Sequence, residues 1–268
     1  MSHAEHYAAP GPLTGLPAHV VAPTSDPVDL CRPVRALVVQ PRDAQALGLP
    51  AERFEDNQVR PADELVRRLL ALDPAPLTTA RPPDRRVVGT CRHFAVLGCA
   101  LLRHRGVPAR VRCGFATYFQ PGRGVDHWVV EYRDGARWVR VDPEVLGGTV
   151  LPHAHDLRPD DFLTGGEAWH AYRRGEVDGN LFGVHGTENW GPSEIRGNAV
   201  RDLAALNKVE VLPWDEWGRM AEAYEGRTGE DYDVLLDELA DVCASDDLPA
   251  VRALYEHDDL RVPDDLIR

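Results

Sequence analysis

Lysine is almost absent from this 268-residue chain: Lys208 is its only lysine among 30 basic residues, and the rest are arginines. That bias is typical of a GC-rich genome. The chain also lacks an apolar run near the roughly 18–20 residues that a membrane-spanning helix requires. Its first thirty residues do not combine a basic start with an apolar stretch. The sequence therefore predicts no signal peptide and a cytoplasmic location.

Cysteine pairs are missing as well. The five cysteines are odd in number and contain no C-x-x-C spacing, which argues against a disulfide framework and a structural zinc site. Acidic residues outnumber basic ones by 43 to 30, giving a formal net charge of −13. Such a surface repels phosphate backbones and anionic lipids, so we expect no nucleic-acid and no membrane partner. A neutral or cationic substrate is easier to accommodate.

Hydrophobic periodicity and turn residues predict a chain of mixed α and β structure. Residues 1–30, rich in Pro, Ala and Gly, are expected to form a loosely attached arm or an edge strand. Helices are predicted at 63–72, from Cys91 to just before Gly106, and at 167–174, 199–208, 231–244 and 248–257. Strands are predicted at 35–40, 107–119, 127–132 and 137–141, and loops at 77–86, 147–165 and 180–198.

One hairpin signal is strong, because the strands HWVVEY and RWVRV are joined around Asp134-Gly135. A two-residue turn at these positions would place His127 directly opposite Asp142. Opposite residues have Cβ atoms about 4.5–5.5 Å apart, so the Asp142 carboxylate would accept the imidazole N–H and fix its tautomer. A slip of one residue would put the two side chains on opposite faces. A cross-strand surface pair is the alternative role for these residues.

Cys91 begins a predicted helix, with Thr90 as its N-cap and Gly106 just past its end. The N–H groups and dipole at a helix start favour an anion, and a thiol there beside a protonated His can have a pKa lowered to roughly 3.5–7.5. The thiolate is the nucleophilic form, and free N–H groups also hold a tetrahedral oxyanion. A buried structural cysteine is the alternative for Cys91 alone. Together with His127 and Asp142, it indicates a Cys–His–Asp triad for acyl transfer.

Four motifs follow one another within about residues 85–145: GTCRHFAVL (89–97), LRHRGVPAR (102–110), DHWVVE (126–131) and WVRVDP (138–143). This pattern resembles the bacterial transglutaminase-like superfamily. The resemblance implies an α+β fold with a papain-like, transglutaminase-like core, in which the nucleophile helix packs on an antiparallel sheet with helical and loop extensions. It also implies that Cys91 is the nucleophile, His127 the base and Asp142 the residue that orients the base.

We expect residues 31–225 to form the catalytic domain, with the arm before it and a helical extension of the same domain at 226–268. The segment GNAVRDLAALNKVEVLPWDEWG (197–218) is similar to one that accompanies this core in bacterial relatives. Those relatives often have Asp where this chain has His93. The departure leaves the predicted triad intact and leaves His93 without an assigned role.

Five further residues are candidates for substrate binding. Arg85 and Arg86 precede the nucleophile closely, and their guanidinium groups suit a substrate carboxylate. A solvated loop is the alternative. Trp128, Trp190 and Trp214 offer flat apolar area with one hydrogen-bond donor each, and packing beneath the loops is their alternative role.

Other residues are given no part in the site. His153-Ala-His155 has metal-ligand types, but no further Cys or His has suitable spacing, so no metal is predicted. Cys99 and Cys113 fall at apolar positions and are expected in the core. A redox pair between Cys91 and Cys99 fits poorly, because eight helical residues span about 12 Å; pairing with Cys113 stays open.

The sequence thus predicts a thiol enzyme that acts on an amide or related acyl bond through a thioester on Cys91, without a cofactor. Its substrate would be a peptide, a protein or a small-molecule amide or amine. Hydrolysis and transfer to an amine both stay open, as does the oligomeric state. The alternative is a non-catalytic protein that uses the same fold to bind a peptide or partner protein.

Overall fold

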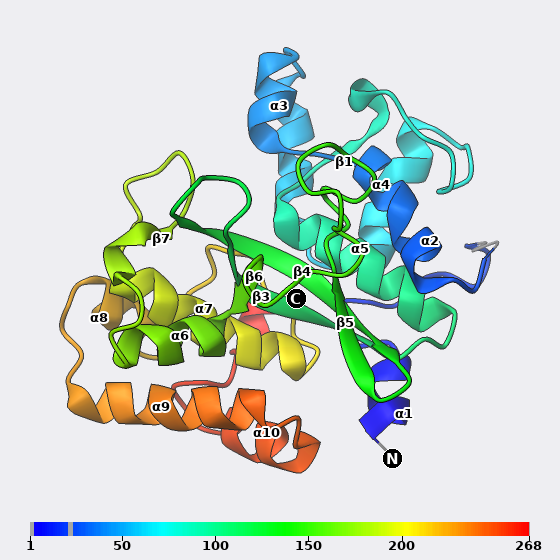
Figure 1. Ribbon diagram of the computed structural model, residues 1–268. Helices are drawn as coiled ribbons and strands as arrows, with labels where there is room; N and C mark the ends of the chain where they lie inside the picture. The colour runs from blue at the N-terminus through cyan, green and yellow to red at the C-terminus, as the bar shows by residue number, and fades with distance from the viewer. Residues whose placement is uncertain (1–2, 21–23, 268) are drawn as a thin grey trace. The chain divides into compact units, whose positions relative to one another are not determined.

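The computed structural model describes residues 3–20 and 24–267 and divides the chain into two compact units (Figure 1). Residues 1–111 and 129–157 make up the first unit, and residues 112–128 and 158–268 the second. Two long strands, β3 (Ala109–Ala116) and β4 (Gly124–Asp134), each contribute residues to both units.

The remaining elements divide between the units as follows. The first unit contains α1 (His3–Ala8), α2 (Pro27–Cys31), η1 (Arg32–Ala36), β1 (Val38–Val39), α3 (Pro41–Ala46), η2 (Ala51–Gln58), α4 (Ala62–Leu72), η3 (Pro83–Arg85), β2 (Val87–Val88), α5 (Cys91–His104) and β5 (Arg137–Val141). The second contains β6 (Phe162–Thr164), α6 (Gly165–Arg173), η4 (Gly179–Leu181), β7 (Phe182–Gly183), α7 (Pro192–Leu206), α8 (Met220–Tyr224), α9 (Glu230–Ala244), α10 (Leu248–Tyr255) and η5 (Asp264–Leu266).

Helix α5 lies at the centre of the first unit. All of its residues from Cys91 to Arg103 are buried, and α1, α2 and α4 contact it. Gly98 permits a close approach to the sheet: a Cβ atom there would lie 3.0 Å from Pro143 Cγ and 3.5 Å from Val130 Cγ2. The helix therefore packs against β4 and against Pro143, which follows β5. This arrangement confirms the predicted α+β fold with a helix on an antiparallel sheet.

The main sheet has the strand order β5-β4-β3-β6, and β7 pairs in parallel with β4. The β4–β5 and β3–β6 pairings are antiparallel. A separate two-stranded parallel sheet joins β1 to β2, with Val38 beside Val87 and Val39 beside Val88. This small sheet leads directly into α5, so it fixes where the helix begins.

The β4–β5 hairpin differs in register from the sequence-based prediction. Asp134 pairs with Arg137, so the two turn residues are Gly135 and Ala136 rather than Asp134 and Gly135. Gly135 has a positive φ of 56° and Ala136 does not, which matches a type II′ turn with Gly first. Each residue of β4 consequently meets a β5 partner two positions later than predicted. The predicted directly opposite pair of His127 and Asp142 is therefore wrong.

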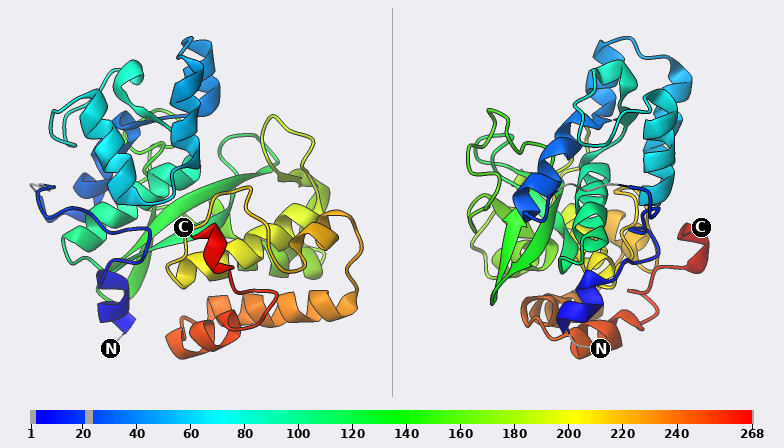
Figure 2. Two further views of the ribbon diagram at one scale, coloured as in Figure 1. Left: turned by 180° about the vertical axis from the view of Figure 1, so that it is seen from behind. Right: turned by 90° about the vertical axis from the view of Figure 1, so that its right-hand side faces the viewer.

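Helices dominate the second unit. Helices α6, α7 and α9 pack on one another, and α10 packs against α7 and α9; Figure 2 shows the orange helices α9 and α10 beside the yellow helix α7. The sequence predicted α9 and α10 closely, and α6 within two residues. Their apolar faces meet around Trp169, Leu203 and Leu236, all fully buried.

Two loop predictions in this unit are partly wrong. Helix α7 begins at Pro192, not near residue 199, so the predicted loop at 180–198 ends seven residues early. Gly191 has a φ of 125°, a conformation that favours glycine, and Pro192 occupies the first helical turn, where it costs no hydrogen bond. The Gly-Pro pair thus starts a helix instead of continuing a loop. Strand β6 likewise lies inside the predicted loop at 147–165.

The described part of residues 1–30 contains helix rather than an edge strand, and several of its side chains are buried. Residues 3–8 form helix α1, whose Tyr7 is buried. The Arg110 guanidinium lies 5.6 Å from the Tyr7 ring centre, and the Trp138 ring meets Tyr7 edge to face at 5.6 Å. Further along, Ala62 N donates to Leu13 O at 2.9 Å. The boundaries predicted for the arm, the catalytic domain and the extension stay predictions.

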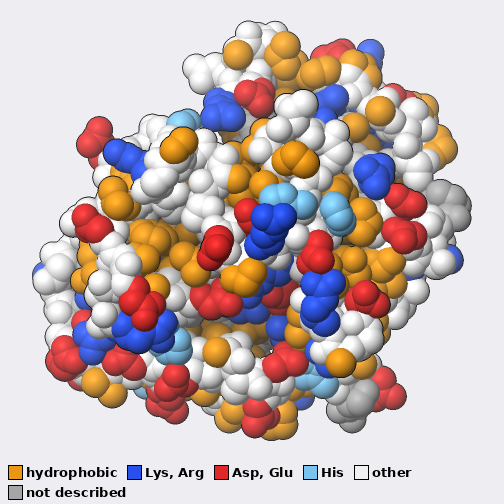
Figure 3. All heavy atoms as spheres, in the orientation of Figure 1, with side chains coloured by type: hydrophobic (Ala, Val, Ile, Leu, Met, Phe, Trp, Pro, Cys, Tyr) orange, Lys and Arg blue, Asp and Glu red, His pale blue; other side chains and the backbone are white. Residues whose placement is uncertain are grey.

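Charged side chains of both signs are interspersed over the face drawn in Figure 3. Ion pairs between exposed side chains join Arg137 to Asp156 and Arg174 to Glu176. Among residues 3–20 and 24–267, no helix is both long enough and apolar enough to cross a membrane.

Candidate functional site

Cys91 is the first residue of α5, as predicted. Cys91 is 7% exposed and forms no disulfide. Thr90 precedes it with extended backbone (φ −85°, ψ 179°) and acts as the N-cap. Cys91 therefore lies where the first N–H groups of the helix have no helical partners.

His93 completes the helix start, which gives this residue a role that sequence reasoning did not assign. Thr90 N donates to His93 Nδ1 at 3.0 Å, and Thr90 and His93 together form a capping box. Burial, aided by the charge of Arg92, lowers the pKa of His93 to about 3. The ring is thus neutral near pH 7, as an Nδ1 acceptor requires. Glu or Gln is the usual partner in such a box, so an imidazole replaces their oxygen here.

Gly89 is required by the same arrangement. A Cβ atom at residue 89 would lie 2.6 Å from His93 Cγ, closer than real contacts allow. The backbone on both sides of Gly89 is also held: its N–H donates to Val39 O at 3.0 Å, and Val88 N donates to Asp56 Oδ2 at 3.3 Å. The segment before the nucleophile is therefore fixed by both β1 and η2.

Arg53 supports the neighbouring part of this segment. Its guanidinium donates to Asp84 O at 2.9 Å and to Arg86 O, and lies 3.5 Å from Asp56. Nothing in the sequence marks the contacts of Arg53 and Asp56 with the segment before Cys91, because these contacts go to backbone groups about thirty residues away. These contacts restrain the loop that leads to Cys91.

Asp142 immediately follows β5 and is fully buried. Its N–H donates to Ala154 O at 2.9 Å, and its Oδ1 accepts from Glu144 N at 2.9 Å. Glu144 Oε1 in turn accepts from Gln40 Nε2 at 2.8 Å. Gln40 directly follows β1, whose Val39 also holds Gly89. The end of β1 thus contacts both the chain that follows Asp142, through Gln40, and the chain that precedes Cys91, through Val39.

His127 lies on β4 within the second unit and is 2% exposed. Two aromatic rings from the β3–β4 connection meet its imidazole edge to face, Phe119 at 4.9 Å and Tyr118 at 6.1 Å between ring centres. The rings cover the imidazole with apolar surface. Sequence reasoning did not single out these two residues.

The candidate substrate-binding residues have different environments. Arg85 is exposed and donates to Leu72 O, whereas Arg86 is half-buried and donates to Arg81 O at 2.8 Å. Burial lowers the pKa of Arg86, and the charge of Arg35 adds to that effect.

The three tryptophans also differ. Trp128 is fully buried, whereas Trp214 is 42% exposed. Trp190 donates its indole N–H to Thr187 O, and the Arg123 guanidinium lies 4.6 Å from its ring. Binding of substrate by these residues stays a prediction.

The other cysteines and the histidine pair have the surroundings that a core and a loop provide. Cys99 and Cys113 are fully buried, as predicted. The chain around His153 and His155 forms turns rather than a strand. Within the described ranges, no group of three or more His, Cys, Asp or Glu residues is arranged to hold a metal ion.

Comparison with known proteins supports the same core. Residues 75–143 match the model of the Transglutaminase-like superfamily, and this range contains Cys91, His127 and Asp142. The match confirms the resemblance found in the motifs: residues 75–143 carry a transglutaminase-like core.

No curated protein matches the chain. Among solved structures, it is similar to a protein from Cytophaga hutchinsonii that is proposed to be a cysteine protease, with 18% identity and a TM-score of 0.22. The alignment covers 57% of this chain and 50% of that one. A likeness at this level carries no inference about function.

Proposed function

We propose that this protein is a thiol-dependent acyltransferase or amidohydrolase with Cys91 as nucleophile, His127 as base and Asp142 as the residue that orients His127. The observation that carries the proposal is the position of Cys91 at the capped start of α5, inside a transglutaminase-like core. The buried environments of His127 and Asp142 support it, because weak dielectric screening strengthens their interaction with charge.

The proposed reaction has two steps. His127 accepts the Cys91 thiol proton, and the thiolate attacks the carbonyl carbon of an amide, giving a tetrahedral oxyanion beside the helix N–H groups. The C–N bond then breaks, the leaving amine takes the proton from His127, and a thioester remains on Cys91. Water or an amine next attacks the thioester and gives a proton to His127, which returns it to the departing Cys91 sulfur. A carboxylic acid or a new amide is released.

The proposed substrate is an amide group of a peptide, a protein or a small molecule. Amine transfer and hydrolysis use the same acyl-enzyme and differ in whether water reaches it. The reaction as written needs no cofactor, because the thiol, the imidazole and the carboxylate supply every proton and electron pair. We also expect the protein to act in the cytoplasm.

The test is the alkylation rate of each cysteine by iodoacetamide at pH 6, located by peptide mass. A thiol with a pKa near 8.5 is about 0.3% ionised at that pH, whereas one with a pKa below 6 is mostly thiolate. Allowing for the weaker nucleophilicity of a low-pKa thiolate, Cys91 should react about 10 times faster than an ordinary thiol of equal access. Cys243 is the internal control, since it is 5% exposed against 7% for Cys91.

The variant His127→Ala separates the outcomes. Fast labelling confined to Cys91 and lost in this variant would support the thiolate–imidazolium pair. Equal rates for Cys91 and Cys243, unchanged by the variant, would refute the catalytic proposal and favour the peptide-binding alternative. Once a substrate is found, Cys91→Ala should abolish turnover without lowering the melting temperature by more than about 2 °C.

A further inference from the structure

The connection between β3 and β4, residues 117–123, carries two aromatic side chains that contact the proposed base. Between ring centres, Phe119 lies 4.9 Å from His127 and 4.7 Å from Tyr118, and Tyr118 lies 6.1 Å from His127. His127 is 2% exposed, whereas the two aromatic residues are only half-buried. The exposed surface of this three-ring cluster therefore belongs mainly to Tyr118 and Phe119.

The loop that carries these rings is attached on both sides of them. Before the rings, Thr117 N donates to Asp161 O at 3.0 Å. After them, the Arg123 guanidinium lies 4.6 Å from the centre of the Trp190 ring. Figure 1 shows the chain before α7 beside the β3–β4 connection. Because the loop is already held in place, binding a ligand to its rings costs little further ordering.

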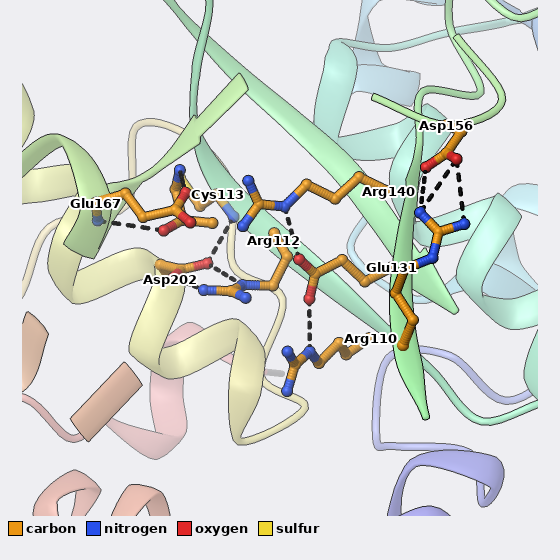
Figure 4. Close-up of polar contacts among 10 residues, drawn as sticks. Arg110, Arg112, Cys113, Glu131, Arg140, Asp156, Glu167 and Asp202 are labelled. Atoms are coloured by element: carbon orange, nitrogen blue, oxygen red, sulfur yellow. Dashed lines mark hydrogen bonds and ion pairs between the residues drawn. The ribbon is translucent and has the colours of Figure 1, made fainter. Parts of the chain in front are cut away.

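The two strands on either side of the loop are held by α7. Asp202 accepts from Arg112 Nε at 2.9 Å and from Nη2 at 2.6 Å (Figure 4). Asn198, which is 1% exposed, donates through Nδ2 to Gly114 O at 3.1 Å and to Asp126 Oδ1 at 2.7 Å. This segment of α7, which the proposed reaction does not use, thus joins the helix to both strands that carry the aromatic loop.

The position of the rings bears on which amine the reaction releases. In the proposed reaction the leaving amine takes its proton from His127, so the amine nitrogen must lie within about 3 Å of an imidazole nitrogen. A substituent on that nitrogen begins one bond further out. Since the Phe119 ring contacts the imidazole, a substituent that extends toward Phe119 packs on it. An apolar substituent buries its surface there, whereas ammonia from a primary amide has no group to bury.

We propose that Tyr118 and Phe119 form a subsite for an apolar group on the leaving-amine side of the substrate. The substrate is then a secondary amide, such as a peptide bond followed by an apolar residue, and not a primary amide. The inference rests on the proposed function, which makes His127 the proton donor to the leaving amine. An aromatic substituent suits the subsite best, because rings that meet edge to face gain more than their buried area alone provides. A carboxylate would lose hydration against the rings.

The experiment measures ligand binding by NMR in the full-length Cys91→Ala protein, which cannot form the acyl-enzyme. The probe is N-benzylacetamide, a secondary amide with a phenyl group on its amine side. The His127 Hε1 signal, assigned by its loss in a protein that also carries His127→Gln, should shift saturably as the probe is added, because the phenyl ring current acts on it. Acetamide, which has no substituent on nitrogen, should give no saturable shift over the same concentrations.

Substitutions of Phe119 test whether its ring binds the probe. Phe119→Ala should raise the Kd of N-benzylacetamide at least about fivefold, because apolar contact area is lost. Phe119→Leu keeps an apolar side chain, so it tests the ring even if Phe119→Ala does not fold, and it should raise the Kd at least about twofold. Tyr172→Ala is the matched control, since Tyr172 is a half-buried ring of the same unit that pairs with Trp169 instead. This control should leave the Kd unchanged.

An unchanged Kd in the Phe119 variants, or equal binding of acetamide and N-benzylacetamide, would overturn the inference. The rate of Cys91 alkylation in the wild-type protein is measured in parallel and decides the proposed function separately. Fast alkylation without binding that depends on the Phe119 ring refutes the inference alone. Ring-dependent binding with alkylation no faster than that of Cys243 refutes the proposed reaction and assigns the subsite to the peptide-binding alternative.

Discussion

The ion pair between Arg112 and Asp202 should be among the most costly polar contacts to break. Both side chains are buried, 5% and 0% exposed, and the carboxylate accepts two bonds from the guanidinium and one from Cys113 N. Asp202→Ala would leave a buried cation and a buried N–H group without this carboxylate. Removing one member of a buried ion pair typically costs about 3–5 kcal/mol, and an abandoned backbone donor costs about 1–3 kcal/mol more. We expect a loss of at least about 4 kcal/mol.

The matched control has the same chemistry in water. Arg137 and Asp156 also form a multiple hydrogen-bonded pair, but their side chains are 60% and 40% exposed. Asp156→Ala should therefore cost about 0–1 kcal/mol. Urea denaturation followed by circular dichroism measures both losses through the transition midpoint.

A double replacement tests the electrostatic reason directly. In Arg112→Leu with Asp202→Leu, no buried charge is left uncompensated, so this protein should be more stable than Asp202→Ala. If Asp202→Ala and Asp156→Ala lost similar amounts, or if the double replacement were the least stable of all, burial would not explain the cost of the pair.

Three other changes have directions that the structure fixes. Burial raises the pKa of Glu194 from about 4.5 to about 7, so the folded protein favours the neutral carboxyl. The stability that this preference contributes is full below pH 4.5 and is lost as the pH rises through 7. The Glu194→Gln side chain is neutral at every pH, so its free energy of unfolding should rise relative to that of wild type by up to about 3 kcal/mol between pH 4.5 and 8. Urea midpoints measured at these two pH values would show no such rise if the carboxyl titrated normally. His93, with a pKa lowered to about 3, has the opposite sign: stability present above pH 6.5 is lost as pH falls toward 3. His93→Gln retains an acceptor for Thr90 N and should reduce the loss of stability at low pH. His93→Ala removes this acceptor as well, so its free energy of unfolding at pH 7 should be about 1 kcal/mol lower. Equal urea midpoints for the two variants at pH 7 would contradict the capping role. Gly114→Ala would put a Cβ atom 2.0 Å from Leu163 O, so it should separate β3 from β6 and lower the melting temperature by more than about 5 °C; a smaller drop would mean that the strands adjust.

Local signals in the sequence were sufficient for much of the fold. An acidic first turn and apolar spacing defined α4, and Thr90 with Gly106 defined both ends of α5. Gly106 has a φ of 73°, as a residue just past a helix end often does. These features depend on residues within one or two helical turns, so the sequence displays them directly.

The hairpin shows where local signals become ambiguous. Asp134-Gly135 suits a type I′ turn, whereas Gly135-Ala136 suits type II′, and both contain the same glycine. The observed pairing of Asp134 with Arg137 selects the second. Because the resulting register differs from the predicted one by an even number of residues, the alternation of side chains along each strand is preserved. The pattern of buried and exposed residues in this hairpin therefore had no power to distinguish the two turns.

Residues that support the candidate site show a further limit. Asn198, Asp202 and Asp56 act on groups 32–90 positions away, several of them backbone atoms that every residue possesses. A sequence reveals such a residue only as a polar type at a position where helical periodicity calls for an apolar one. Asn198 and Asp202 meet that description within α7, because Ile195 and Ala205, which share their face by helical spacing, are apolar and fully buried. Since a buried polar group without a partner is costly, two of them one turn apart imply that matching groups exist. The sequence therefore indicates that buried side chains of α7 form hydrogen bonds or ion pairs with another part of the chain. Only the fold identifies the partners as Gly114, Asp126 and Arg112.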